Sequence, residues 1–361
     1  MLVQYFIKQL TKVNIPTIER NQCIHFRSRK KGCKKCKEVC PTKSIDIGEK
    51  NIRIDENLCV GCGSCEAICP SQAISQREDK KQKALQMGKE VESLIIGCQE
   101  GHNKGNALFS CLNGLHPEYI AAFLLMFKKK KVYFNISGCN KCKVHRDCSL
   151  FTANLERAKR FINAFEDIDN AVVMGEEEKL PIGIEKEMSR RDFITMLKKE
   201  STNATVKFIQ QQNNRKKNTV SYHRWLFLEI IDRLSFPETK IIPKEVSLFT
   251  GWQVNSECDG CGFCQAICPR EAWSCTKDKD HISITNDVTK CTSCNLCFDL
   301  CPQQAIMKED FSFIQFKGAV EKRKLPLASC RQCEKSFVEK KDNNGLCSSC
   351  NKREAIKNNI G

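Results

Sequence analysis

The stretch CDGCGFCQAICP, from Cys258 to Pro269, nearly repeats CVGCGSCEAICP, from Cys59 to Pro70, which lies 199 positions earlier. Two further segments follow similar spacing, CKKCKEVCPTKSI at 33–45 and CTSCNLCFDLCPQQAI at 291–306. The four segments form two pairs, which indicates two copies of one structural unit. Most of the 26 cysteines of this 361-residue chain stand in such clusters. This usage favours metal binding over a disulfide framework.

The residues between the two motifs of each pair predict a hairpin. In the first pair, Ile45 and Ile47 alternate with polar residues, a turn follows at 48–51, and Ile52 and Ile54 alternate again. The second pair has isoleucines at 282 and 284 in the same place. Each pair therefore predicts one compact module of roughly 50 to 60 residues, a size that needs a metal or disulfide to be stable.

The spacing CxxCxxCxxxCP, complete in residues 258–269 and 291–302, is the bacterial ferredoxin run that binds [4Fe-4S] clusters. Residues 258–306 resemble a two-cluster bacterial-type ferredoxin domain, and residues 23–74 resemble an altered copy. In such domains the fourth cysteine of each run ligates the other cluster. The resemblance implies one cluster on Cys258, Cys261, Cys264 and Cys301, and another on Cys291, Cys294, Cys297 and Cys268. Glycines in the motifs let backbone amides approach the cluster sulfurs.

The altered copy departs from the pattern in its first motif, which lacks one cysteine in register. The nearest upstream cysteine is Cys23, separated from the motif by a basic loop. We expect one cluster on Cys59, Cys62, Cys65 and Cys40, and the other on Cys23, Cys33, Cys36 and Cys69. Two alternatives remain open for the second set: His25 as the ligand, or a three-iron cluster without the fourth site.

The middle of the chain alternates strand and helix patterns, which predicts a small parallel α/β domain. Its cysteines follow two of the predicted strands, where open α/β folds hold their ligands. The candidate site residues are Cys98, Cys111, Cys139 and Cys142. This placement is loosely similar to that in small iron-sulfur subunits of hydrogenases and heterodisulfide reductases, which implies a fifth iron-sulfur site. A zinc site, redox-active thiols and inert core cysteines are the alternatives.

A last quartet of cysteines stands near the end of the chain. Its spacing, CxxC followed by 13 residues and a second CxxC, is close to that of a zinc ribbon. The predicted metal ligands are Cys330, Cys333, Cys347 and Cys350. Zinc is the expected metal, and a rubredoxin-like single iron is the alternative.

Together these patterns predict an α+β chain with two ferredoxin-like 2[4Fe-4S] modules flanking a small parallel α/β domain. The expected boundaries are a first module at 1–80, the α/β domain at 90–175, a charged linker with helices at 176–250, a second module at 251–310 and a zinc-ribbon-like tail at 325–355.

The formal net charge of +16 would ordinarily suggest a nucleic-acid partner. All-cysteine [4Fe-4S] sites and a zinc tetrathiolate each carry about −2, so five clusters and one zinc would remove about 12 units. Nucleic acid is therefore an unlikely partner. The basic segment at 27–37 would attract an acidic redox protein. The alternative is a solvated loop without a docking role. With no membrane-span pattern and no export signal, a cytoplasmic location is expected.

The motif search finds no Walker loop, dinucleotide-binding GxGxxG, GxSxG or HExxH. The resemblance implies an electron-transfer protein or redox-enzyme subunit with about four [4Fe-4S] clusters. One alternative is an oxidoreductase whose catalytic cluster, in residues 98–142, acts on a sulfur or disulfide substrate. A second is a redox or iron-sulfur sensor that uses its tail as an interaction module.

Overall fold

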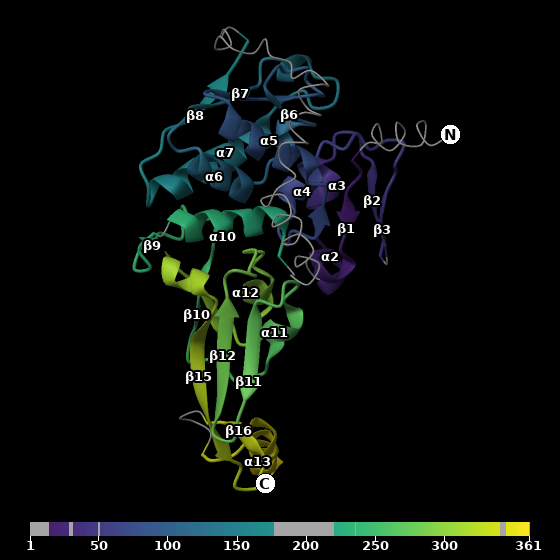
Figure 1. The fold of residues 1–361 in the computed structure, drawn as a ribbon. Helices are drawn as coiled ribbons and strands as arrows, with labels where there is room; N and C mark the ends of the chain where they lie inside the picture. The colour runs from purple at the N-terminus through teal and green to yellow at the C-terminus, as the bar shows by residue number, and fades with distance from the viewer. Residues whose placement is uncertain are drawn as a thin grey trace, which may run out of the picture. The chain divides into compact units, whose positions relative to one another are not determined.

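A computed structural model describes residues 14–28, 32–49, 51–176, 220–234, 236–339 and 344–360. The basic loop at 29–31 and most of the expected charged linker, residues 177–219, lie outside the described residues. The chain divides into two compact units, one up to Phe236 and one from Pro237 onward (Figure 1).

The described part of the first module contains two short antiparallel ladders and three short α-helices. Strand β2 pairs with β3, with Ile45 opposite Ile54 and Ile47 opposite Ile52, which confirms the predicted hairpin. Strand β1 pairs with β4. The elements are β1 Thr17–Ile18, η1 Arg20–Gln22, α2 Ile24–Arg27, α3 Lys35–Val39, β2 Ile45–Ile47, β3 Ile52–Ile54, α4 Ser64–Ile68 and β4 Ile74–Ser75.

The α/β domain follows in the same unit. Its elements are α5 Asp79–Glu90, β5 Leu94–Cys98, β6 Ala107–Phe109, η2 Leu112–Gly114, α6 Pro117–Met126, β7 Val132–Asn135, η3 Cys139–Lys141, α7 Ser149–Asn163 and β8 Ala171–Met174. The four strands form a parallel sheet in the order β6-β5-β7-β8. Chain connections run in opposite directions from the neighbours β5 and β7, so their carboxyl ends form a topological switch point.

Helix α10, Tyr222–Leu234, lies within the range 176–250 and packs on α6 of the α/β domain. Its apolar residues are buried, and the ring of Phe227 lies 5.7 Å from that of Phe161 on α7. Arg224 is also buried and forms an ion pair with Glu118 on α6. This part of the expected linker therefore belongs to the core of the first unit.

The second unit holds the second module and the tail. Its elements are β9 Ile241–Ile242, β10 Gly251–Val254, α11 Phe263–Ile267, β11 Trp273–Lys277, β12 His281–Asp287, α12 Leu296–Leu300, β13 Ile306–Glu309, β14 Phe311–Ser312, η4 Phe313–Lys317, β15 Ala319–Ser329, β16 Ser336–Val338 and α13 Ser348–Ile360. Strand β10 pairs with β13, as β1 does with β4 in the first module. The hairpin β11–β12 continues through β15 into β16, which leads to the tail.

Candidate iron-sulfur and metal centres

The second module gathers its eight motif cysteines into two pockets. One pocket is lined by Cys258, Cys261, Cys264 and Cys301, and the other by Cys268, Cys291, Cys294 and Cys297. These are the two crosswise sets that the sequence predicts, with the last cysteine of each motif in the pocket of the other. Helices α11 and α12 position the sets because each starts just before the third cysteine of its motif.

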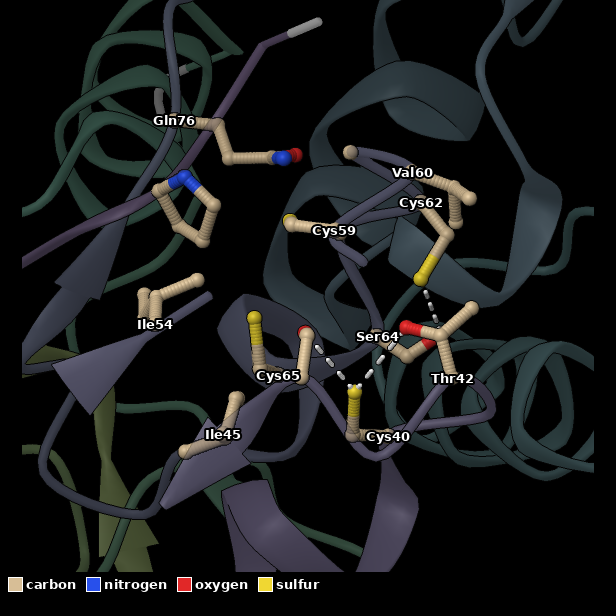
Figure 2. A pocket seen from close by; sticks show the side chains of 14 residues that line it. Cys40, Thr42, Ile45, Ile54, Cys59, Val60, Cys62, Ser64, Cys65 and Gln76 are labelled. Carbon is tan, nitrogen blue, oxygen red and sulfur yellow. Dashed lines mark hydrogen bonds between the residues drawn. The ribbon is translucent and has the colours of Figure 1, made fainter. Parts of the chain in front are cut away.

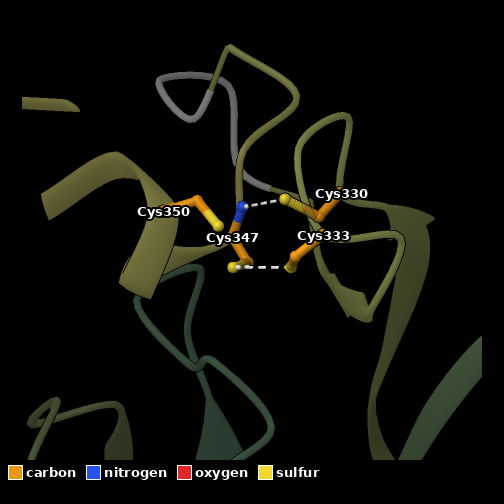
Figure 3. Close-up of side chains that lie close together, drawn as sticks. All are labelled: Cys330, Cys333, Cys347 and Cys350. Carbon is orange, nitrogen blue, oxygen red and sulfur yellow. Dashed lines mark hydrogen bonds between the residues drawn. The ribbon is translucent and has the colours of Figure 1, made fainter. Parts of the chain in front are cut away.

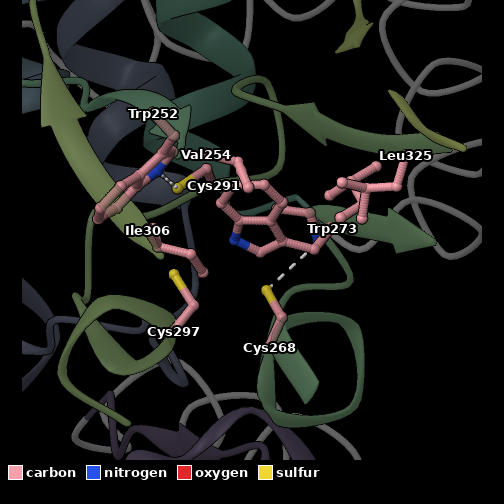
Figure 4. Packing of buried hydrophobic residues seen from close by; sticks show 10 residues of the cluster. Trp252, Val254, Cys268, Trp273, Cys291, Cys297, Ile306 and Leu325 are labelled. Carbon is pink, nitrogen blue, oxygen red and sulfur yellow. Dashed lines mark hydrogen bonds between the residues drawn. The ribbon is translucent and has the colours of Figure 1, made fainter. Parts of the chain in front are cut away.

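Several N–H groups donate to the sulfurs of this module. The indole N–H of Trp252 donates to Cys291 Sγ at 3.3 Å, as Figure 4 shows. The backbone amide of Ala272 donates to Cys268 Sγ at 3.3 Å, and that of Ala305 to Cys301 Sγ at 3.4 Å. Such hydrogen bonds stabilise thiolate charge and tune the potential of a bound cluster.

The first module repeats one of these pockets. Figure 2 shows the side chains of Cys40, Cys59 and Cys65 around it, and Cys62 also lines it. Hydroxyl groups form hydrogen bonds with the sulfurs here. Cys40 Sγ lies 3.3 Å from Ser44 Oγ, and the Cys62 thiol donates to Ser64 Oγ at 3.5 Å. Gly63 adopts a left-handed conformation with φ of 83°, and Asn295 has the equivalent conformation in the second module, with φ of 64°. The motif thus fixes the same turn in both modules.

The remaining cysteines of the first module also lie near one another. Burial, followed by the nearby thiols of Cys69, Cys33 and Cys23 in that order, raises the pKa of Cys36 to about 12. Cys23, directly before α2, therefore lies near the thiols of the first motif. The Nε2 atom of His25 lies 3.1 Å from the carbonyl oxygen of Gly48, a backbone partner rather than a thiol.

Burial and neighbouring thiols raise the pKa values of several cysteines in these pockets. Desolvation and neighbouring thiols disfavour the thiolate, so the pKa of Cys65 rises, as do those of Cys62 and Cys297. Four thiolates gathered in one partly buried pocket need a compensating cation. An iron-sulfur cluster supplies that charge together with four iron atoms that thiolates ligate, so the donor set fits.

The cysteines of the α/β domain stand at the switch point between β5 and β7. The amide of buried Asn103 donates to Cys98 Sγ at 3.2 Å and to Cys139 Sγ at 3.6 Å, which ties the ends of both strands together. The backbone amide of Gly101 donates to Cys98 Sγ at 3.4 Å. Cys111 and Cys142 are also buried. Burial raises the pKa of Cys111, and the nearby thiols of Cys98 and Cys142 contribute to the rise.

Cys148 adds a fifth thiol to this region. A hydrogen bond with Cys139 raises the pKa of Cys139 and lowers the pKa of Cys148 to about 7. Cys139 and Cys148 thus form a hydrogen-bonded pair beside this site. This contact could not be assigned from sequence, because the loop between the two residues has no regular pattern.

The tail cysteines form the tightest thiol group among the described residues. The four Sγ atoms of Cys330, Cys333, Cys347 and Cys350 all lie within 4.8 Å of one another (Figure 3). Those of Cys333 and Cys347 are 3.7 Å apart. Zinc–sulfur bonds of about 2.3 Å in a tetrahedron place sulfurs about 3.8 Å apart. A hydrogen bond from the Cys347 amide lowers the pKa of Cys330 to about 6. The donor set fits a single tetrahedral metal ion.

Two features were missed in the sequence. Cys275 on β11 lies with its Sγ atom 3.8 Å from that of Cys264. His116, Glu118 and His223 place ligand-type atoms within 4.8 Å of one another. Here the guanidinium of Arg224 donates to both Glu118 oxygens at 2.7 Å, so a cation already balances this carboxylate. Only the pairing of α10 with α6, which no sequence pattern reveals, brings these residues together.

Within the described ranges, no helix combines the length and the apolar character that crossing a membrane requires.

Comparison with known protein families agrees with the cysteine geometry. A LdpA Fe-S cluster-binding domain matches residues 31–80. Two models of a 4Fe-4S binding domain match residues 255–273 and 284–307. No curated protein matches the chain. The matches cover both modules, and the chain is therefore a multi-cluster iron-sulfur protein with a role in electron transfer.

Proposed function

We propose that the chain relays single electrons between redox partners through four [4Fe-4S] clusters, two in each module. The observation that carries the proposal is the crosswise grouping of the cysteines: a motif's last cysteine lines the pocket of the other motif in both modules. A single chance site would not reproduce this exchange twice. The clusters supply one-electron chemistry when bound, and the protein contributes burial and hydrogen bonds to sulfur.

The proposed ligands follow the pockets. In the second module they are Cys258, Cys261, Cys264 and Cys301 for one cluster, and Cys268, Cys291, Cys294 and Cys297 for the other. In the first module they are Cys40, Cys59, Cys62 and Cys65, and Cys23, Cys33, Cys36 and Cys69.

For the α/β domain we propose an additional iron-sulfur site on Cys98, Cys111, Cys139 and Cys142. Support comes from the burial of Cys98, Cys111 and Cys142 and from the Asn103 amide, which donates to the sulfurs of Cys98 and Cys139. A second function, thiol chemistry on a sulfur substrate, is favoured by one observation: Cys148 is only partly buried and is hydrogen-bonded to Cys139. Alkylation of Cys148 at pH 7 under anaerobic conditions would distinguish an accessible thiolate from a buried, protected one.

For the tail we propose structural zinc, and for the first module an acidic redox partner. Exposed Lys34 and Lys35 stand beside Cys33 and Cys36, and Arg53 is exposed on the hairpin of the same module. A positive face next to a cluster favours encounter with a negatively charged protein. A cytoplasmic location would suit exposed thiols and clusters, which oxidise readily.

The test is the content of iron, acid-labile sulfide and zinc in protein purified without oxygen, followed by EPR of the reduced form. We expect about 16 irons from four clusters, two to four more from the α/β site, and one zinc. Fewer than about 12 irons would contradict the four-cluster relay. About 16 irons with no further signal would remove only the α/β site.

A further inference from the structure

We propose that electrons leave the first module through the cluster of Cys40, Cys59, Cys62 and Cys65 and pass directly into the cysteine site of the α/β domain. The inference rests on the proposed function, because both places must hold iron-sulfur clusters. It adds an order to the relay, with one cluster for uptake and one for delivery, and it names the contact through which delivery occurs.

The contact is backbone against backbone. A Cβ atom on Gly114 would lie 2.5 Å from the carbonyl oxygen of Cys62 and 3.1 Å from the Cα atom of Gly63. Gly114 ends the turn η2, which starts directly after Cys111. The backbone of the motif at Cys62 and Gly63 thus contacts η2, the turn that follows Cys111, with no side chain between them.

A second loop of the α/β domain reaches the same motif. The Nε2 atom of His145 lies 3.0 Å from Ser64 Oγ, and this hydroxyl accepts a hydrogen bond from the Cys62 thiol. His145 stands between Cys142 and Cys148 in the chain. Loops carrying Cys111 and Cys142 therefore both contact the start of helix α4.

Buried charges hold the two parts in place. Lys81 on α5 and Glu66 on α4 form an ion pair of 2.7 Å, and both side chains are almost fully buried. Gln72, which follows Cys69, donates to Glu118 on α6, and Glu118 pairs with Arg224. Removing one partner of such a pair leaves a buried charge without compensation, which strongly destabilises the contact. The separation between the two cysteine sites is therefore fixed rather than dependent on chance encounter.

The second module provides an internal comparison. Glu66 follows the third cysteine of its motif and is 4% exposed, whereas Phe298 holds the equivalent position on α12 and is 40% exposed. The residue after the third cysteine is thus covered by the α/β domain in the first module and exposed in the second. The ferredoxin motif itself therefore does not require that this position be covered.

The other cluster of the first module faces the opposite environment. Lys34, Lys35 and Lys37 are exposed around Cys33 and Cys36, so an external donor can approach there. A reduced, negatively charged donor protein would transfer one electron to this cluster. The donor would be oxidised by one electron and the cluster reduced by one electron. The electron then moves to the covered cluster and on to the α/β site, which is reduced by one electron as the covered cluster returns to its oxidised state. No proton or other atom is transferred.

The test is EPR of the fully reduced full-length chain after iron content has been measured. Spin coupling between the cluster of Cys40, Cys59, Cys62 and Cys65 and the α/β site should split or broaden the EPR signal of the α/β site. Cys65→Ser should abolish this splitting. Cys297→Ser, the equivalent change in the second module, should leave it unchanged. If the splitting is lost in Cys297→Ser but persists in Cys65→Ser, the inference is wrong.

A second pair of variants tests the contact without touching a ligand. Gly114→Val should push η2 away from Cys62, weaken the splitting and slow reduction of the α/β site severalfold in freeze-quench experiments, with iron content unchanged. Gly175→Val is the control, because a Cβ atom there meets nothing within 4 Å. Unaltered coupling and rate in Gly114→Val overturn the inference. If the α/β domain holds no iron, both the proposed α/β site and this inference are wrong. If both sites hold iron but show no spin coupling, only this inference is wrong.

Discussion

At the scale of single residues, equivalent clusters of the two modules have different neighbours. Val254 pairs with Ile306 and Ile18 with Ile74. Trp252 in β10 and Pro16, just before β1, each stand two residues before these paired positions. Pro16 lines the pocket of its module, but it has no N–H group and cannot donate to a sulfur. The indole of Trp252 is fully buried and does donate.

We predict that Trp252→Phe lowers the reduction potential of the cluster beside Cys291. The indole N–H stabilises the reduced, more negative form, and a hydrogen bond worth about 0.5–1.5 kcal/mol corresponds to roughly 20–60 mV for one electron. Potentiometric EPR of the anaerobic protein measures the change. Trp225→Phe, a change on α10 in the other unit, is the matched control. An equal shift in both variants, or none in either, would refute the assignment.

A second residue-scale prediction concerns stability and pH. Burial, followed by the nearby cations Arg157, Arg224 and Lys81, lowers the pKa of His116 to about 4, while Glu118 opposes this effect. An unfolded histidine protonates near pH 6.5, so between pH 6.5 and 4 the unfolded chain binds the extra proton. Stability therefore falls as the pH drops through this window, by about 3 kcal/mol in total.

The measurement is the melting temperature of the first unit at pH 7 and pH 5 in the full-length protein. His116 caps α6 by accepting from the Glu118 amide, and asparagine can do the same without titrating. His116→Asn should therefore keep most stability at pH 7 and lose less than the wild type at pH 5. The same pH dependence in both proteins would show that His116 contributes nothing to it.

At the scale of elements, the tail depends on its four cysteines. Strand β16 is short, helix α13 is exposed at its start, and few apolar residues are buried in this part of the chain. We predict one zinc per chain, and loss of amide protection in 330–350 when Cys333→Ser or a chelator removes it, because metal binding supplies the folding free energy. Hydrogen exchange of the full chain measures this. Protection that persists in zinc-free protein would exclude a structural role.

Elements differ in how far the sequence predicts them. The hairpin β2–β3 follows from alternation of isoleucines around a turn, and β5 and α6 follow from short, dense apolar runs. The sequence does not predict that α10 packs on α6, since Arg224 and His223 look like surface residues until Glu118 and His116 are placed opposite them. Nor does it place Asn103 between two sulfurs, because a loop amide has no local signature.

At the scale of the whole molecule, charge distribution connects the clusters to their surroundings. The formal charge of +16 is largely offset by about −12 from the proposed cofactors, so the remaining positive charge matters where it is local. Lys34 and Lys35 provide such a local charge beside one cluster of the first unit. Charge steering of this kind changes the rate of encounter more than the final affinity.

We predict that Lys34→Glu with Lys35→Glu slows reduction of the chain by an acidic one-electron donor protein by roughly tenfold at low salt. The difference should shrink as salt approaches 0.1 M, where the screening length is about 10 Å. Stopped-flow bleaching of cluster absorbance measures the rate. Lys352→Glu with Arg353→Glu, an equal charge change at exposed positions of the tail, should leave the rate close to that of the wild type. If both double variants slow reduction equally, net charge governs encounter and the face beside Cys33 has no special role. If only the first does, that face is where electrons enter.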